Sequence, residues 1–378
     1  MLKKNFVIFS VAIVFSFLLV EVISRLIIPT PLNPPPLLKV SPFIKNNYIL
    51  QRRPFDFFHI PHSQYIQVIP KREIPYVINS FGFREREIDS NPPPNTKRLI
   101  VIGDSITEGH GVKMKNRFTD LLRDDAANTG WEIVNYAIQG GSLLHYAVNI
   151  NRYLELSPSS VLIVLFDNDI WDDRRREEDY DKLKYIENPY VFKKNNFLSL
   201  FFRSRFIQLF YQAWNTYCIR PPLNEIEKII YEHKVNPRAR NELNTMSGIP
   251  RGQWPISPSL LDHQWSLSKP YFDYIIQKFQ EKKIPVFISH FTDKKYGRKN
   301  NSWIYSYLLD KKIMAYANYN GLPFFSLLPI VTEYYKNKSY SFHDLQIPHD
   351  GHPTEKGHQL IASALKPWLI KNLKRIEH

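Results

Sequence analysis

The chain has 378 residues, of which 43% are hydrophobic and 14% aromatic, and this content excludes a globally disordered protein. Its 50 Lys and Arg against 36 Asp and Glu give a formal net charge of +14, but the basic residues are scattered and no nucleic-acid-binding motif accompanies them. We therefore expect no nucleic-acid partner, and the single cysteine, Cys218, excludes an internal disulfide.

Residues 1–28 are predicted to form an N-terminal membrane anchor. Residues 6–20 are uncharged and follow two lysines, so the lysines should stay cytoplasmic while the rest of the chain is exported. A spanning helix needs about 20 residues, so the span is complete only if Glu21 and Arg25 pair at the outer interface. A cleaved signal peptide is the alternative, but no small-x-small cleavage site follows. We expect a single-pass protein of the cytoplasmic membrane with its remaining residues on the extracytoplasmic (periplasmic) side.

Residues 29–97 are predicted to be a proline-rich linker and a lead-in segment. Residues 29–50 are rich in proline and should form an extended, semi-rigid spacer. Residues 76–88, YVINSFGFREREI, contain short β-like runs. We expect this lead-in to pack on the domain that follows it.

Residues 98–378 alternate short apolar runs with amphipathic helical patterns, which is typical of βαβ units that build a parallel sheet. The apolar runs suit strands buried on both faces, and the prediction is a three-layer α/β/α, flavodoxin-like fold. Residues 171–258 interrupt the rhythm and are interpreted as a helical insertion; a lid or an acceptor-binding role rests only on their position after the third strand. The predicted strands cover residues 99–103, 132–137, 161–166, 284–290 and 322–327.

The first predicted strand leads directly into the turn GDSITEG, which begins at Gly103. Ligands collect at the carboxyl ends of parallel strands, and Gly103 permits a sharp turn that places Ser105 where backbone N–H groups favour negative charge. A bare strand-turn-helix accounts for the glycines but not for the serine. The segment LIVIGDSITEG resembles the first block of the SGNH hydrolase family, also called GDSL esterases, whose nucleophile matches Ser105.

The next two strands are followed by segments similar to the second and third blocks of this family. In NYAIQGGS, the glycine that donates a backbone N–H to the oxyanion matches Gly140, although glycines that only turn the chain explain this segment equally well. In FDND, the asparagine that donates its side-chain amide matches Asn168. The family often has glycine where this chain has Phe166, which affects the expected backbone shape more than the role of the amide.

Near the C-terminus, PHDGHPTEKGHQ resembles the fifth block, in which an acid and a histidine precede the final helix. The histidine matches His352. The acid usually stands three residues earlier, where this chain has His349, so we assign Asp350 as the acid and keep Asp344 in reserve. His343, His349 and His358 are interpreted as surface or supporting histidines. The anchor and lead-in also look like those of membrane-tethered members of the family.

The resemblance implies a serine esterase that acts on O-acyl, chiefly O-acetyl, esters of envelope glycans or lipids through an acyl-serine intermediate. Ser105, His352 and Asp350 would form the triad, and the N–H groups of Ser105 and Gly140 with the amide of Asn168 would form the oxyanion hole. A polysaccharide O-acetyltransferase using the same residues and a catalytically idle glycan-binding module are the alternatives. No P-loop lysine and no metal-ligand spacing is present, so we expect no cofactor.

Overall fold

The computed structural model describes part of the chain, and the predicted anchor (1–28), the spacer and the insertion lie largely outside it. Within the described part, no helix combines the length and the apolar composition that a membrane crossing requires. The described residues are Ser16, Leu19, Val20, 44–45, 49–53, 56–59, 61–69, 72–126, 129–173, 225–235, 258–292, 302–336, 342–348 and 350–376.

A five-stranded parallel sheet forms the centre of the fold, in the order β10-β9-β8-β6-β7. The first strand of this sheet in the sequence, β6, lies between β7 and β8, so the strand order reverses at its carboxyl end. That edge is the usual ligand site of such sheets. The predicted parallel sheet is confirmed, with strand ends that differ by up to two residues. The strands are β6 (Lys97–Ile102), β7 (Trp131–Asn135), β8 (Ser160–Phe166), β9 (Val286–Phe291) and β10 (Phe324–Ser326).

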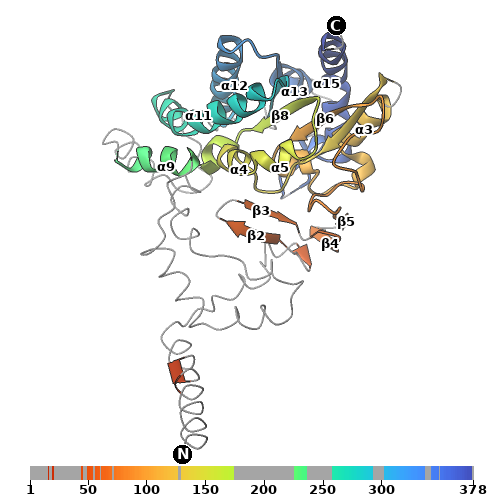
Figure 1. Ribbon diagram of the computed structural model, residues 1–378. Coiled ribbons are helices and arrows are strands. Elements are labelled where there is room, and N and C mark those ends of the chain that lie inside the picture. The colour runs from red at the N-terminus through yellow and green to blue at the C-terminus, as the bar shows by residue number, and fades with distance from the viewer. Residues whose placement is uncertain are drawn as a thin grey trace, which may run out of the picture.

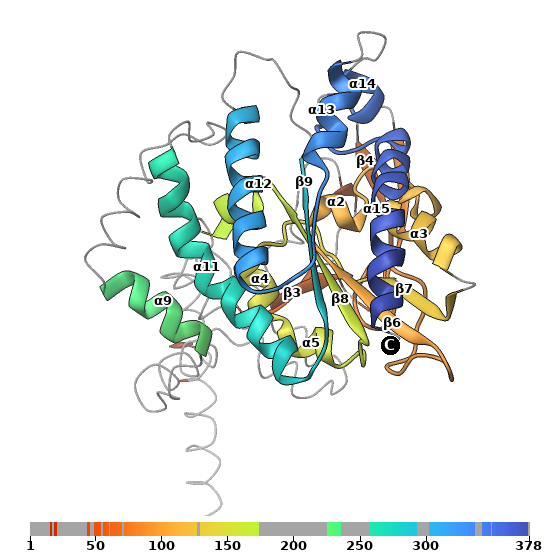
Figure 2. The ribbon, with the colours of Figure 1, turned by 90° about the horizontal axis from the view of Figure 1, so that it is seen from above.

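Both faces of the sheet are buried, because successive apolar side chains point to opposite sides. In β6, Leu99 and Val101 enter one core, whereas Ile100 and Ile102 enter the other. Figure 2 shows helices on the two sides of the sheet, which makes three layers. One side carries α4 (Leu143–Val148), α5 (Ile150–Leu154), α11 (Pro258–Glu281) and α12 (Ser302–Tyr319); the other carries α3 (Phe118–Ala126), α13 (Leu328–Lys336) and α15 (Glu355–Arg375).

The helices agree with the apolar periodicity of the sequence, with one difference. Between β7 and β8 a single amphipathic face is expected, but Asn149 separates two short helices there. The final helix buries Ile361, Leu365 and Leu369. Within the predicted insertion, α9 (Glu225–Val235) is helical, and its buried Ile226 belongs to the core on the α11 side of the sheet.

An antiparallel hairpin precedes the parallel sheet. It consists of β4 (Gln64–Ile69) and β5 (Arg72–Val77), and β1 (Ile44–Lys45) pairs with β4. Burial alternates along β4, where Gln67 is buried although it is polar. A second small hairpin joins β2 (Ile49–Arg53) to β3 (Asp56–His59). The β-like runs that the sequence suggests at residues 76–88 are mostly turns, since β5 ends at Val77.

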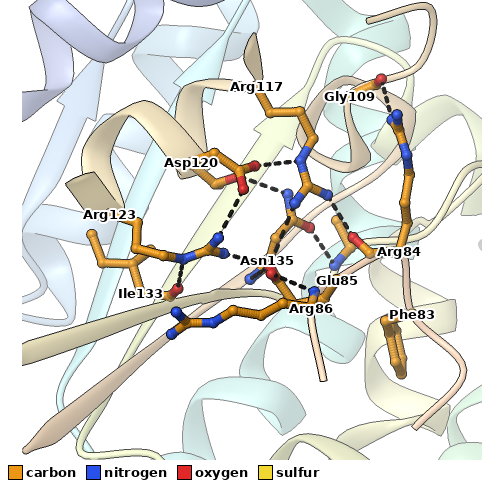
Figure 3. Close-up of polar contacts among 12 residues, drawn as sticks. Phe83, Arg84, Glu85, Arg86, Gly109, Arg117, Asp120, Arg123, Ile133 and Asn135 are labelled. Atoms are coloured by element: carbon orange, nitrogen blue, oxygen red, sulfur yellow. Dashed lines mark hydrogen bonds and ion pairs between the residues drawn. The ribbon is translucent and has the colours of Figure 1, made fainter. Parts of the chain in front are cut away.

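The turns after β5 insert two charged side chains into the interior. Arg84 donates to the carbonyl oxygens of Gly109 (2.6 Å) and Val112 (2.7 Å). Glu85 accepts from the Arg123 guanidinium at 2.6 Å and from the backbone N–H of Asn135 at 2.9 Å. Figure 3 shows these contacts converging from the lead-in, from α3 and from β7. Through Arg84, the lead-in therefore holds the loop that contains Gly109 and Val112, which follows the Ser105 turn.

Candidate active site

Ser105 begins the short helix α2 (Ser105–Glu108), directly after the turn that closes β6. The Asp104 carboxylate caps this helix by accepting the backbone N–H of Ile106 at 2.9 Å. A Cβ at Gly103 would lie 2.3 Å from Oγ1 of Thr107, so the turn closes this tightly only with glycine. Ser105 is 9% exposed and so lies at the edge between core and surface.

Two predicted residues from the C-terminal region meet Ser105. His352 places Nε2 2.9 Å from the Ser105 hydroxyl, and its Nδ1 lies 2.5 Å from Oδ1 of Asp350. Asp344, the reserve acid, instead lies 3.9 Å from the Lys356 ammonium. The structure thus joins serine, histidine and acid in one chain of hydrogen bonds, and the acid in it is Asp350.

The short spacing between acid and histidine is accommodated by Gly351. This residue adopts a left-handed conformation with φ 88°, which bends the chain between its two neighbours. As a result, Oδ1 of Asp350 also accepts the backbone N–H of His352, at 3.3 Å. An acid two positions before the histidine can therefore reach Nδ1 of the ring, as an acid three positions before it does in the family pattern.

The charge state of Asp350 follows from its neighbours. Burial alone would raise its pKa, but hydrogen bonds from His110 and His352, together with their charges, hold the pKa of Asp350 well below its usual value. Asp350 is therefore a carboxylate at neutral pH, and Nδ1 of His352 carries the proton that it accepts. This tautomer leaves the Nε2 lone pair of His352 facing the Ser105 hydroxyl, as a general base requires.

His110 joins this group, although the sequence analysis did not select it. Its Nε2 lies 3.2 Å from Oδ2 of Asp350, and its ring stacks on that of His352 with centroids 3.9 Å apart. Its Nδ1 lies 2.7 Å from the side-chain amide nitrogen of Gln67. Two signals were available: a histidine five residues after the serine, and a polar residue on the inward face of an alternating strand.

Among the described residues, His110, Asp350 and His352 also form a group that has the donor atoms for a metal ion, all within 4.8 Å of one another. Their mutual hydrogen bonds already account for this proximity. A metal ion bound there would take Nδ1 of His352 away from Asp350. The donor set therefore fits a histidine-carboxylate relay better than a metal centre.

Buried carboxyl groups surround the other side of the Ser105 turn. Burial, and then the charges of Asp172 and Glu108, raise the pKa of Asp104 to about 7. Burial and the charge of Asp104 likewise raise the pKa of Asp169 well above its usual value. The raised pKa values let these groups take up protons near neutral pH, which limits the negative charge beside Ser105. The turn after β8 lies next to the turn after β6 because the two strands are paired in the sheet.

The predicted oxyanion donors lie on turns that adjoin the Ser105 turn. Gly140 has φ 77°, and the nearby N–H of Ile138 donates to the Gly103 carbonyl at 3.1 Å, which ties the β7 turn to the β6 turn. The side-chain amide of Asn168 donates to Asp172 at 2.9 Å. That contact uses one of its two amide hydrogens. The oxyanion role of both residues stays a prediction.

The histidine of the final helix lies outside the triad. His358 is fully buried and accepts the backbone N–H of Phe118 at 3.3 Å. Burial, and then the charges of Arg117 and Arg84, lower its pKa to about 3, so it is neutral. His343 belongs to the short helix α14 (Phe342–Leu345), and His349 lies outside the described residues.

A cavity of about 310 Å³ opens between α3, β7 and α15, and its lining includes Leu122, Trp131 and Leu369. None of the triad residues lines it. This cavity therefore gives no information about the substrate of the Ser105 site.

Comparison with known proteins gives solved structures only, since no family model and no curated protein sequence matches the chain. A lipolytic protein of the G-D-S-L family from Desulfitobacterium hafniense shares 10% identity, with 72% of this chain and 99% of that chain covered and a TM-score of 0.38. The esterase EstA from a Pseudoalteromonas species shares 13% identity, with 72% and 98% covered and a TM-score of 0.38.

An acetyl xylan esterase, AlAXEase, is similar at 14% identity, with 72% of this chain and 98% of that chain covered and a TM-score of 0.38. The names of these structures include the GDSL family and esterases, the group that the motifs resemble. These structures are too distant to carry an argument about mechanism or substrate. Those arguments rest on the side chains of this chain.

Proposed function

We propose that this protein is a serine esterase that cleaves O-acyl esters through an acyl-serine intermediate. The observation that carries the proposal is the continuous hydrogen-bonded chain from Ser105 through His352 to Asp350, with contacts of 2.9 and 2.5 Å. Three groups from two distant parts of the sequence meet in the order that nucleophilic catalysis needs. A binding module has no need of this arrangement.

In the acylation step, Nε2 of His352 accepts the proton of the Ser105 hydroxyl while the oxygen attacks the ester carbonyl. The imidazolium that forms faces the Asp350 carboxylate, which stabilises its charge. His352 then gives the proton to the leaving alcohol, and the acyl group stays on Ser105. In the second step His352 takes a proton from water, whose oxygen attacks the acyl-serine carbonyl. The bond to Oγ then breaks, His352 returns the proton to Ser105, and the acid is released.

The negative charge that develops on the carbonyl oxygen requires hydrogen-bond donors. We assign the backbone N–H groups of Ser105 and Gly140 and the side-chain amide of Asn168 to this role. Asp172 engages one amide hydrogen of Asn168 and so orients the group, which leaves the second hydrogen for the oxyanion. Such donors act before the reaction begins and need no reorganisation during it.

Labelling with a fluorophosphonate probe tests the nucleophile. We expect the wild-type protein and Ser157→Ala to be labelled, because Ser157 is an exposed serine on the loop before β8. Ser105→Ala should remain unlabelled while keeping its circular dichroism spectrum. Absence of labelling in the folded wild-type protein would favour the idle-module alternative.

We further propose that the natural substrates are O-acyl, chiefly O-acetyl, groups of envelope glycans or lipids, encountered outside the cytoplasmic membrane. The support is the apolar segment at residues 6–20 that follows two lysines. Incubation with isolated envelope polysaccharide should release acetate. Transfer of labelled acetate onto the polysaccharide, with no release, would instead identify the transferase alternative.

The location has its own test. A C-terminal tag on the full chain should stay with membranes through alkaline carbonate washing and should be degraded by protease added to spheroplasts. Recovery in the soluble fraction, or protection from the protease, would contradict the proposed location.

A further inference from the structure

We propose that Gln67 and His110 are positioning residues that hold the outer oxygen of Asp350 and thereby fix the orientation of His352. This inference rests on the proposed esterase function and extends it to the N-terminal hairpin. His110 touches the acid and the catalytic ring, and Gln67 acts through His110. Neither residue belongs to the motifs that suggested the site.

The contacts at the two ends of this relay determine which group donates in each of its hydrogen bonds. The backbone N–H of Gly111 donates to Oε1 of Gln67 at 2.9 Å, which identifies the oxygen of the Gln67 amide. The amide nitrogen must then donate to Nδ1 of His110, at 2.7 Å. Because Nδ1 accepts, the proton of the neutral His110 ring is on Nε2, from which it donates to Oδ2 of Asp350 at 3.2 Å.

Asp350 needs this second anchor because its own segment holds only one of its oxygens. Both contacts from His352, the ring nitrogen and the backbone N–H, go to Oδ1. The next residue, Gly351, has open space around the position of a Cβ, so packing there does not restrain the turn. Without His110, rotation of the carboxylate would misalign the bond to His352.

His110 itself is held from the hairpin side. Gln67 is completely buried on the inward face of β4. On the neighbouring strand, the Arg72 guanidinium contacts both oxygens of Glu355 at 2.8 and 2.9 Å and donates to the Gly111 carbonyl at 3.3 Å. These contacts tie the hairpin to the segment that follows α2 and to the first residue of α15. The hairpin thus completes the site from outside the parallel sheet.

Burial favours the neutral form of His110 that the relay needs. Burial, and then the charge of His352, lower its pKa, whereas Asp350 and Glu108 act in the opposite direction. Gln67 contributes no charge. A neutral ring stacked on His352 leaves the Asp350 carboxylate free to balance the imidazolium that forms during acylation.

The test compares His110→Phe, which keeps an aromatic ring but removes the donor, with His110→Gln, which restores an N–H donor. Gln67→Leu removes the inner end of the relay. Ile66→Ala is the matched control, because Ile66 is the neighbour of Gln67 in β4 and is 46% exposed. Each full-length variant is assayed in detergent on a soluble activated acetyl ester, with kcat and KM measured separately.

We expect His110→Phe and Gln67→Leu to lower kcat by roughly ten- to a hundredfold with KM nearly unchanged, since a misplaced catalytic group slows chemistry more than binding. His110→Gln should recover part of the loss, and Ile66→Ala should match the wild type. A direct readout is the far-downfield proton resonance of the short hydrogen bond between His352 and Asp350. This resonance should weaken or shift in folded His110→Phe. It should stay unchanged in His110→Gln and in Ile66→Ala.

The failure of this inference is distinguishable from failure of the proposed function. If the wild-type protein neither reacts with the fluorophosphonate nor hydrolyses the ester, the proposed function fails. If the wild type is active and folded His110→Phe has the same kcat and the same downfield resonance, the positioning role is wrong. If His110→Phe loses activity because it unfolds, the other two variants decide. An unchanged kcat in folded Gln67→Leu contradicts the positioning role, and so does a resonance that is lost in folded His110→Gln although its kcat equals that of the wild type.

Discussion

Replacing Glu85 by alanine removes the central acid of the buried charge cluster in Figure 3. Its carboxylate accepts from Arg123 at 2.6 Å, from the Asn135 N–H at 2.9 Å and from Arg117 at 3.5 Å. Glu85 and Arg117 are both fully buried, so the alanine variant leaves a buried positive charge and a buried backbone donor with fewer partners. Removing one partner of a buried ion pair typically costs about 3–5 kcal/mol.

Urea unfolding followed by tryptophan fluorescence measures this loss, which is a large part of the roughly 5–15 kcal/mol stability of an ordinary domain. Glu87→Ala is the matched control. Glu87 lies two residues further along the same segment, is exposed, and bonds only to Ser80 among the contacts described for it. We expect the control to change stability by less than about 1 kcal/mol. A similarly small loss in Glu85→Ala would refute the idea that the lead-in is held by this cluster.

Three further predictions follow from the site and its supports. Asn168→Ala should lower kcat on an acetyl ester about a hundredfold or more without changing the fold; an unchanged rate removes Asn168 from the oxyanion hole. Gly351→Ala should cost about 1–2 kcal/mol in unfolding free energy, from its positive φ alone. Gly109→Ala should cost more, because its Cβ would also lie 2.3 Å from Cγ of Arg117, and equal losses would contradict this. Burial alone lowers the pKa of His290, but hydrogen bonds with Asp167 and Asp310 outweigh it and raise that pKa to about 9. The stabilisation is therefore complete below the unfolded value of about 6.5 and is lost as pH rises through about 9, so the unfolding free energy should fall across this window in the wild type but not in His290→Asn.

The parallel sheet was predictable because its strands are apolar on both faces. Leu99 to Ile102 alternate between the two cores, and a run of this kind has few other places in a soluble fold. The ends of the strands were less certain: Gly103, which the sequence assigns to a strand, belongs to the turn that Thr107 crowds. Tertiary packing determines such boundaries.

The triad residues were recognisable because each belongs to a local motif next to a strand or the last helix. His110 and Gln67 were not, because their contact joins residues 43 positions apart and depends on how a hairpin docks. Arg84 and Glu85 were missed for another reason. Charged residues are usually exposed, so a sequence rule places them at the surface unless their buried partners are known.

The role of the lead-in has a practical consequence for anyone shortening this chain. A fragment beginning at residue 97 would retain every strand of the parallel sheet, and by that criterion it would look complete. It would nevertheless lack Gln67, Arg72, Arg84 and Glu85, so the inner nitrogen of His110, the Gly109 carbonyl and the Asn135 N–H would lose their contacts. A shortened version intended for crystals or for kinetics should therefore begin no later than residue 44, where the first strand of the hairpin sheet starts.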